Sequence, residues 1–212
     1  DNVTKLKNKK LEKSIQINIP NLERTDKTKS IFDAIVKIIK NDLNVLIFGE
    51  SGTGKKQVAT TINNLTSNKK ILEINYLDYK NKNLDDFLLN KLSVDSFLNT
   101  KNLKVMDISD NILITDIDKM SLKTQNLLYY ALKSKKKNCL NFLKNKRIIA
   151  TTSKNIKNSL RNNNFSNELF YQLDMYNIFT IPIRERSEDI PLLIKNIVNE
   201  YNNTYNTKKE IE

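Results

Sequence analysis

The stretch GESGTGKK at residues 49–56 constrains the fold of this chain most, because it holds every glycine in the sequence. Glycine tolerates positive φ angles and lets the backbone approach a ligand closely, so successive N–H groups of such a turn can converge on phosphate oxygens. The apolar run VLIF precedes the turn, and the segment after it carries inward-facing apolar residues at helical spacing: Val58, Ala59, Ile62 and Leu65. A buried strand, a glycine-rich turn and a helix in this order predict a phosphate-binding loop.

The expected nucleotide-binding residues are those of the loop itself: Gly49, Glu50, Ser51, Gly52, Thr53, Gly54, Lys55 and Lys56. Lys55 would supply a positive charge to the β and γ phosphates of ATP or ADP. At the next position a Ser or Thr hydroxyl ordinarily holds Mg²⁺, whereas the lysine found here offers the metal no oxygen. The sequence therefore predicts phosphate binding but does not favour metal-assisted hydrolysis.

Apolar runs alternate with amphipathic segments along the rest of the chain. Strands are expected over residues 45–48, 71–74, 111–115, 147–151 and 177–183. Besides the helix after the loop, helices are expected from an N-cap at Ser30 and over residues 121–134, 167–173 and 188–203. In the helix over 121–134 the apolar face would be formed by Leu122, Leu127, Leu128 and Leu132. Buried strands separated by helices predict an α/β fold with a parallel sheet covered on both faces.

Composition narrows the range of functions. The chain has no histidine and one cysteine, Cys139, which excludes an internal disulfide, His-based catalysis and Cys-cluster metal sites. The net charge of +12 allows a nucleic-acid partner, but the lysines are scattered, and biased residue usage is the favoured interpretation. No apolar stretch is long enough to span a membrane and no secretory signal is present, so a cytoplasmic location is expected. The initial Asp suggests a piece of a longer protein.

The loop GESGTGK is more specific than a general phosphate loop. It resembles that of the ATPase domain of NtrC-type bacterial enhancer-binding proteins, the AAA+ activators of sigma-54 RNA polymerase. Further segments similar to this family follow in order over residues 28–203: ILEIN, SLKTQNLLYYAL, RIIATTSKNI, FSNELFYQL and IPIRERSEDIPLL. The resemblance implies an AAA+ P-loop NTPase with a five-stranded parallel sheet. It also implies a linker or extended arm over 1–24, the α/β nucleotide-binding domain over 25–187, and the first helix of a lid over 188–212.

The family's acidic pair, an Asp for Mg²⁺ and a Glu for the attacking water, falls in the segment NILITDIDKM. Asp116 takes the Mg²⁺ position if one residue is deleted after it. Without a gap, Asp116 takes the Glu position and Thr115 the Asp position. Asp116 is thus the candidate catalytic residue and metal ligand. Asp118 is an alternative acid, although an exposed loop carboxylate is the favoured interpretation.

Other catalytic positions of the family also differ in this chain. The sensor residue falls on Ser153, and the arginines offered to a neighbouring subunit fall on Ser166 and Gln172, with Arg161 nearby. Two further arginines, Arg184 and Arg186, either orient the lid or a protomer contact or form salt bridges; the acids within reach are Glu185, Glu188 and Asp189. The two interpretations of these arginines are equally favoured.

Residues 80–110, where the family carries its sigma-contacting GAFTGA loop, contain no glycine. Some NtrX-like regulators also lack this loop, so an NtrX-like response regulator is the preferred identity. The leading hypothesis is the ATP-binding central domain of a two-component transcriptional regulator with weak or absent ATP hydrolysis. Expected partners are further copies of the chain, in a hexamer or heptamer ring or a dimer, and sigma-54 RNA polymerase, with DNA bound through a domain outside this chain. One alternative is an active ring-forming ATPase that remodels sigma-54 RNA polymerase and uses Arg161 and Asp118. Another is a DNA-associated scaffold that binds no nucleotide.

Overall fold

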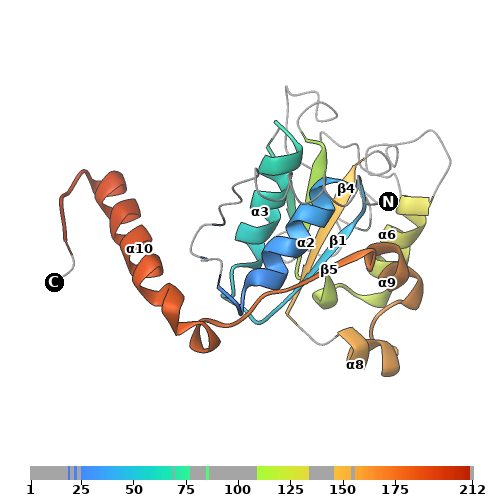
Figure 1. Cartoon of the computed structure of the whole chain (residues 1–212). Coiled ribbons are helices and arrows are strands. Elements are labelled where there is room, and N and C mark those ends of the chain that lie inside the picture. Colours follow the sequence, from blue (N-terminus) through green and yellow to red (C-terminus); the bar gives the residue numbers. More distant parts are fainter. Residues whose placement is uncertain are drawn as a thin grey trace, which may run out of the picture.

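The computed structural model describes residues 19, 22, 25–68, 70–76, 85, 109–133, 146–153 and 156–210. Its centre is a five-stranded sheet in the order β2-β3-β4-β1-β5, and all neighbouring strands pair in parallel (Figure 1). The strands are β1 (Val45–Phe48), β2 (Leu72–Asn75), β3 (Asn111–Thr115), β4 (Arg147–Thr152) and β5 (Tyr176–Phe179). The predicted five-stranded parallel α/β sheet is confirmed.

Helices cover both faces of this sheet (Figure 1). They are α2 (Lys29–Ile39), α3 (Lys55–Thr66), α6 (Leu122–Lys133), α8 (Ile156–Arg161), α9 (Asn167–Leu173) and α10 (Ile190–Tyr205). Side chains alternate between the faces of a strand, and β3 shows the result. Its Leu113 packs with the apolar residues of α2 and α3, whereas Ile112 and Ile114 pack with those of α6 and α9. The core therefore consists of two apolar layers, one on each face of the sheet.

Three local predictions differ from the structure. The first helix begins at Lys29 with Thr28 as its N-cap, so Ser30 lies within the first turn. Strand β5 ends at Phe179 instead of 183, because Pro182 has no N–H and leads into a 3₁₀ turn, η3 (Ile183–Glu185). Leu122 is 44% exposed, since α6 turns a different face inward, consisting of Thr124, Gln125, Leu128 and Ala131.

Two residues of the predicted arm over 1–24 belong to the core. Ile19 and Leu22 are buried, pair in an isolated β-bridge and pack in the apolar layer of α2 and α3. The other residues of that segment lie outside the described ones. A core therefore reaches further toward the N-terminus than the predicted boundary at residue 25, while the division into domains stays a prediction.

Helix α10 stands apart from the sheet in Figure 1. It has no buried residue, although it carries apolar side chains at helical spacing: Ile190, Ile194, Ile197, Tyr201 and Tyr205. Pro191 lies in its first turn, as the sequence predicts. A second 3₁₀ turn, η4 (Ser187–Asp189), joins it to η3. Among the described residues, no helix combines the length and apolar character that crossing a membrane requires.

Candidate nucleotide site

The predicted phosphate-binding loop joins the carboxyl end of β1 to the N-terminus of α3. Gly52 and Gly54 have φ angles of 79° and 89°, a left-handed conformation that favours glycine, and Gly54 is the N-cap of α3. A cleft of about 910 Å³ opens beside the loop and is lined by Gly52, Gly54, Lys55, Lys56, Gln57, Thr60, Thr61, Asn64, Leu65, Thr115, Asp116 and Thr151. The free N–H groups of the first helical turn and the positive end of the helix dipole make this position suitable for an anion.

Gly49 is required for a different reason, which is space. A Cβ placed on Gly49 would lie 1.9 Å from Oγ1 of Thr180 and 2.8 Å from Oγ1 of Thr53. These two hydroxyls are themselves hydrogen-bonded at 2.7 Å, and Thr180 donates to the carbonyl of Phe48. The start of the loop is thus held against the residue that follows β5.

We expect Gly49→Ala to weaken nucleotide binding about tenfold more than Gly52→Ala, because overpacking against Thr53 and Thr180 adds about 1–3 kcal/mol to the φ strain that both variants share. Gly52→Ala is the matched control, because a Cβ there meets nothing within 4 Å and only the unfavourable φ remains. Titration calorimetry with ATP would compare the two variants. Equal affinities would contradict the role assigned to the Thr53–Thr180 contact.

Lys55 lies where the sequence predicts, on the first turn of α3. Its ammonium donates to the carbonyl oxygens of Gly49 and Glu50, both at 2.7 Å. Burial lowers the pKa of Lys55, the carboxylates of Asp116 and Asp118 act in the opposite direction, and the charge of Lys119 adds to the lowering. The ammonium is therefore placed between the loop and the acids that follow β3.

Lys56 lines the same cleft, but its ammonium is paired with a strand residue. Its Nζ lies 2.5 Å from Oε2 of Glu73 on β2. Lysine thus occupies the position of the metal-binding hydroxyl and interacts with a neighbouring carboxylate. Direct contact between Lys56 and a nucleotide stays a prediction.

The acids after β3 are arranged by a 3₁₀ turn, η2 (Ile117–Lys119). Asp116 is its N-cap and has a left-handed φ of 53°. Its carboxylate accepts a hydrogen bond from Lys119 at 2.8 Å, and its backbone N–H donates to Oγ1 of Thr151. Asp116 therefore lies on the cleft, as predicted, with its carboxylate already engaged.

The turn brings Asp118 back over the end of β4. Its Oδ1 accepts from the backbone N–H of Ser153, at the predicted sensor position, at 3.3 Å. Its Oδ2 is buried and makes no hydrogen bond to any described residue. The interpretation of Asp118 as an exposed loop carboxylate is therefore wrong. The signal that could have revealed this is the Asp residue before the turn, since Asp tolerates the left-handed conformation better than most residues.

The residues present do not fit a bound Mg²⁺. This metal requires oxygen ligands in near-octahedral geometry, whereas Lys56 presents an ammonium and the carboxylate of Asp116 is paired with Lys119. Across the described ranges, no group of three or more His, Cys, Asp or Glu side chains is placed to hold a metal. The assignment of Asp116 as a metal ligand stays a prediction that the geometry does not favour.

The two arginines after β5 both form ion pairs, but in different surroundings. Arg184 makes a bidentate pair with Glu50 of the loop, at 2.7 and 2.6 Å, and this hydrogen bonding lowers the pKa of Glu50. Arg186 is buried and pairs with Asp189 at 2.6 Å. The predicted salt bridges are confirmed for Arg186 with Asp189 and for Arg184 with Glu185, the latter at 3.7 Å. The shorter pair of Arg184 with Glu50 was missed because the two residues are 134 positions apart in the sequence.

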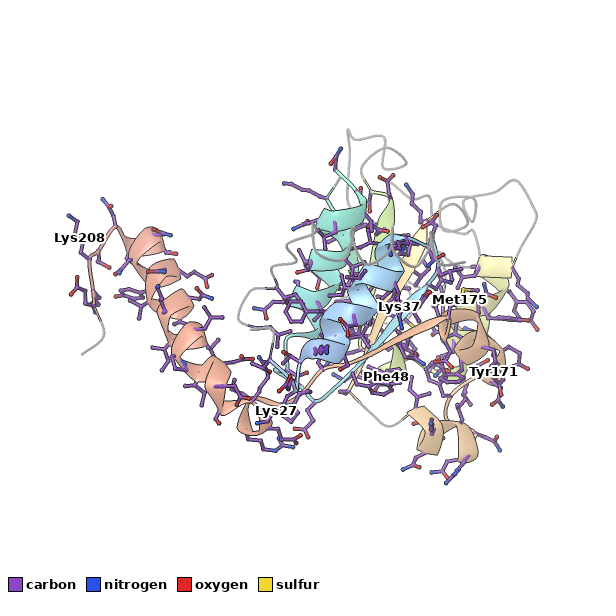
Figure 2. All side chains as sticks on the ribbon, viewed as in Figure 1. Lys27, Lys37, Phe48, Tyr171, Met175 and Lys208 are labelled. Carbon is purple, nitrogen blue, oxygen red and sulfur yellow. The ribbon has the colours of Figure 1, made fainter. Side chains whose placement is uncertain are left out.

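The turn before α10 forms one further ion pair with the sheet domain. Figure 2 shows Lys27 close to the start of this helix, where its ammonium lies 3.3 Å from the carboxylate of Glu188. Together with the Glu50–Arg184 pair, this contact connects the turns η3 and η4, which precede α10, to the loop and to the segment before α2.

The positions expected for a trans-acting arginine have other roles in this chain. Ser166 is the N-cap of α9 and accepts from the N–H of Leu169, while the backbone carbonyl of Gln172 accepts from Asn44. Arg161 is exposed at the end of α8. Most of residues 80–110, where the resemblance places the family's sigma-contacting loop, lies outside the described residues, as does Cys139.

The sheet order, the glycine loop between β1 and α3 and the acids after β3 define the class as P-loop NTPases of the AAA+ type, as predicted. The structure is similar to that of NtrX from Brucella abortus in complex with ADP (TM-score 0.69, 18% identity, 100% of this chain and 47% of that chain). It is also similar to the P-loop NTPase domain of a sigma-54 activator from E. coli (TM-score 0.52, 13% identity, 76% of this chain and 99% of that chain). These identities show the fold alone.

The family follows from the sequence comparisons. The model of the sigma-54 interaction domain matches residues 22–179, so the chain belongs to that family. It is 27% identical over 181 residues to the formate hydrogenlyase transcriptional activator of Salmonella typhimurium, covering 81% of this chain and 26% of that protein. It is 25% identical over 198 residues to the DNA-binding transcriptional regulator NtrC of Rhizobium meliloti, covering 89% of this chain and 41% of that protein. The chain thus spans less than half of these relatives.

Proposed function

We propose that this chain is the ATP-binding central domain of an NtrC/NtrX-like response regulator of transcription, with weak or absent ATP hydrolysis. The observation that carries the proposal is that one cleft combines an intact phosphate-binding loop with altered metal-binding positions. The glycine loop and Lys55 are arranged for phosphates, while Lys56 is paired with Glu73 and Asp116 with Lys119. The site retains what binding requires and has lost what metal-assisted hydrolysis requires.

The role of the nucleotide follows from the contacts of the loop. The phosphates would be bound by the N–H groups of residues 49–55 and by the ammonium of Lys55. Glu50, in the same loop, pairs with Arg184 in η3, the turn that leads through η4 into α10. Occupancy of the loop would therefore bear on the position of the predicted lid helix, and through it on contacts between protomers. In this function ATP or ADP sets the geometry of an assembly.

The wider partners belong to the proposal as well. The names of the relatives support control of transcription, and the family supports action on sigma-54 RNA polymerase. Self-association in a hexamer or heptamer ring or a dimer is part of the proposal. DNA would be bound through a domain outside this chain, and the location would be cytoplasmic. The segment 80–110 lacks the glycines of a GAFTGA sequence, so contact with the sigma factor would use another surface.

ATP turnover measured over a range of protein concentrations tests this function. We expect a rate per protomer that is near the background of Lys55→Ala and does not rise with concentration, because an arginine supplied in trans contributes about 10³–10⁵ in rate and neither Ser166 nor Gln172 can provide it. Arg161→Ala should leave this rate unchanged. ATP binding itself, measured in parallel by calorimetry, must be present in the wild type.

The second candidate is the active ring-forming ATPase. The buried oxygen of Asp118, close enough to Lys55 to affect its pKa, is the observation that favours it, because a carboxylate there could orient an attacking water. A rate per protomer that rises with concentration and is lost in Arg161→Ala would establish this alternative.

A further inference from the structure

The phosphate cleft contains an unusual set of cations. Lys55 and Lys56 line it, with Lys56 at the position of the metal-binding hydroxyl, and Lys119 is paired with Asp116, which also lines it. Burial lowers the pKa of Lys55 most, and the positive charge of Lys119 adds to the lowering. Of the two positions expected to bind a metal ion, position 56 is itself a lysine and Asp116 is paired with Lys119.

Carboxylates balance these charges in the described structure. They are Glu73, which pairs with Lys56, Asp116, which pairs with Lys119, and Asp118, which accepts from the N–H of Ser153 at the end of β4. Both lysine pairs are partly exposed, with side-chain exposures of 64% and 34% for Lys56–Glu73 and 38% and 27% for Lys119–Asp116. Partly exposed ion pairs contribute little free energy. Phosphate oxygens can therefore replace the carboxylates as partners of the two ammonium groups with little loss of free energy.

A divalent metal would meet the opposite situation. Mg²⁺ binds through one or two carboxylates together with the phosphates and requires oxygen ligands. Here its charge would face the ammonium of Lys56, and its candidate ligand Asp116 would have to release Lys119. The ammonium of Lys56 repels the metal but attracts the phosphates of the nucleotide alone, while Asp116 must release Lys119 in both cases.

We propose that this site binds ATP or ADP as a metal-free anion, with the ammonium groups of Lys56 and Lys119 in the electrostatic role that Mg²⁺ has in related sites. The inference rests on the proposed nucleotide binding and adds the chemical form of the ligand. It also accounts for weak hydrolysis, since a lysine stabilises bound phosphates but cannot coordinate them in the geometry of a metal ion.

Titration calorimetry with ATP, in excess Mg²⁺ and separately in EDTA, tests the inference. We expect the wild type to bind ATP more weakly in excess Mg²⁺ than in EDTA, because Mg²⁺ then occupies the phosphates of the free nucleotide and the ammonium of Lys56 repels the resulting complex. Lys56→Thr provides a hydroxyl in place of the charge, so its affinity should be weaker in EDTA and recover about tenfold with Mg²⁺. Lys56→Met removes the charge without adding an oxygen, and it should be weakened in both buffers without recovery.

The outcomes separate the two proposals. Wild-type binding that is lost in EDTA and restored by Mg²⁺ overturns the metal-free inference and leaves nucleotide binding intact. If the wild type shows no binding heat in either buffer, as expected of Lys55→Ala, both the proposed function and the inference are overturned. Lys56→Met that behaves like the wild type in EDTA also overturns the inference, because the ammonium would then have no part in holding the phosphates.

Discussion

Lys55→Ala is expected to weaken ATP binding by about 100-fold, the equivalent of one strong charge-assisted hydrogen-bonding group worth about 1.5–3 kcal/mol. The ammonium has two functions in the loop. It would contact the β and γ phosphates, and it also bridges the carbonyls of Gly49 and Glu50 at 2.7 Å. Alanine removes the charge and leaves both carbonyls without this donor, so the loop loses its ligand contact and part of its shape.

Lys37→Ala is the matched control, because this exposed lysine lies on α2 (Figure 2) and is not among the residues that line the cleft. Calorimetry with ATP measures both variants, and circular dichroism confirms that both are folded. An affinity of Lys55→Ala within about threefold of the wild type would show that the loop does not bind phosphates through this residue.

The second large effect concerns stability. Arg186→Ala is expected to lower the free energy of unfolding by about 3 kcal/mol, because removing one partner of a buried ion pair leaves an uncompensated charge. The side chains of Arg186 and Asp189 are 7% and 0% exposed, and Nε of Arg186 also donates to the carbonyl of Ile181. With alanine at position 186, the buried carboxylate of Asp189 no longer has the guanidinium group that balances its charge.

Arg184→Ala is the matched control for the stability effect of Arg186→Ala. Arg184 also pairs with an acid and lies two residues away, but its side chain is 62% exposed. An exposed pair contributes up to about 1 kcal/mol, so this variant should unfold close to the wild-type midpoint in urea. If the two variants lost equal stability, burial would not be what makes the Arg186–Asp189 pair strong.

The sequence predicted the sheet well because its strands are continuous apolar runs that can only be buried between two layers of helices. The phosphate loop was equally legible, since Gly52 and Gly54 do adopt the left-handed conformation that their residue type permits. Errors arose where exposure depends on a turn. Asp118 was misjudged because the left-handed Asp116 redirects the chain after β3.

Contacts between distant segments could not be predicted by pattern. The pair Glu50–Arg184 and the pair Lys56–Glu73 join residues of ordinary exposed type, and periodicity carries no information on which charged side chains meet. Ile19 and Leu22 sit in a polar, basic stretch, so their burial depends on an apolar surface provided by elements much later in the chain. These are tertiary effects that a local reading of the sequence does not contain.

The exposed helix α10 follows the turns η3 and η4, and η3 carries Arg184, the partner of Glu50 in the phosphate loop. Its 16 residues extend for about 24 Å at 1.5 Å per residue. A tilt of about 10° at the foot would therefore move the far end by about 4 Å. An adjustment of the phosphate loop too small to disturb the sheet would in this way become a displacement large enough to make or break a contact with another molecule.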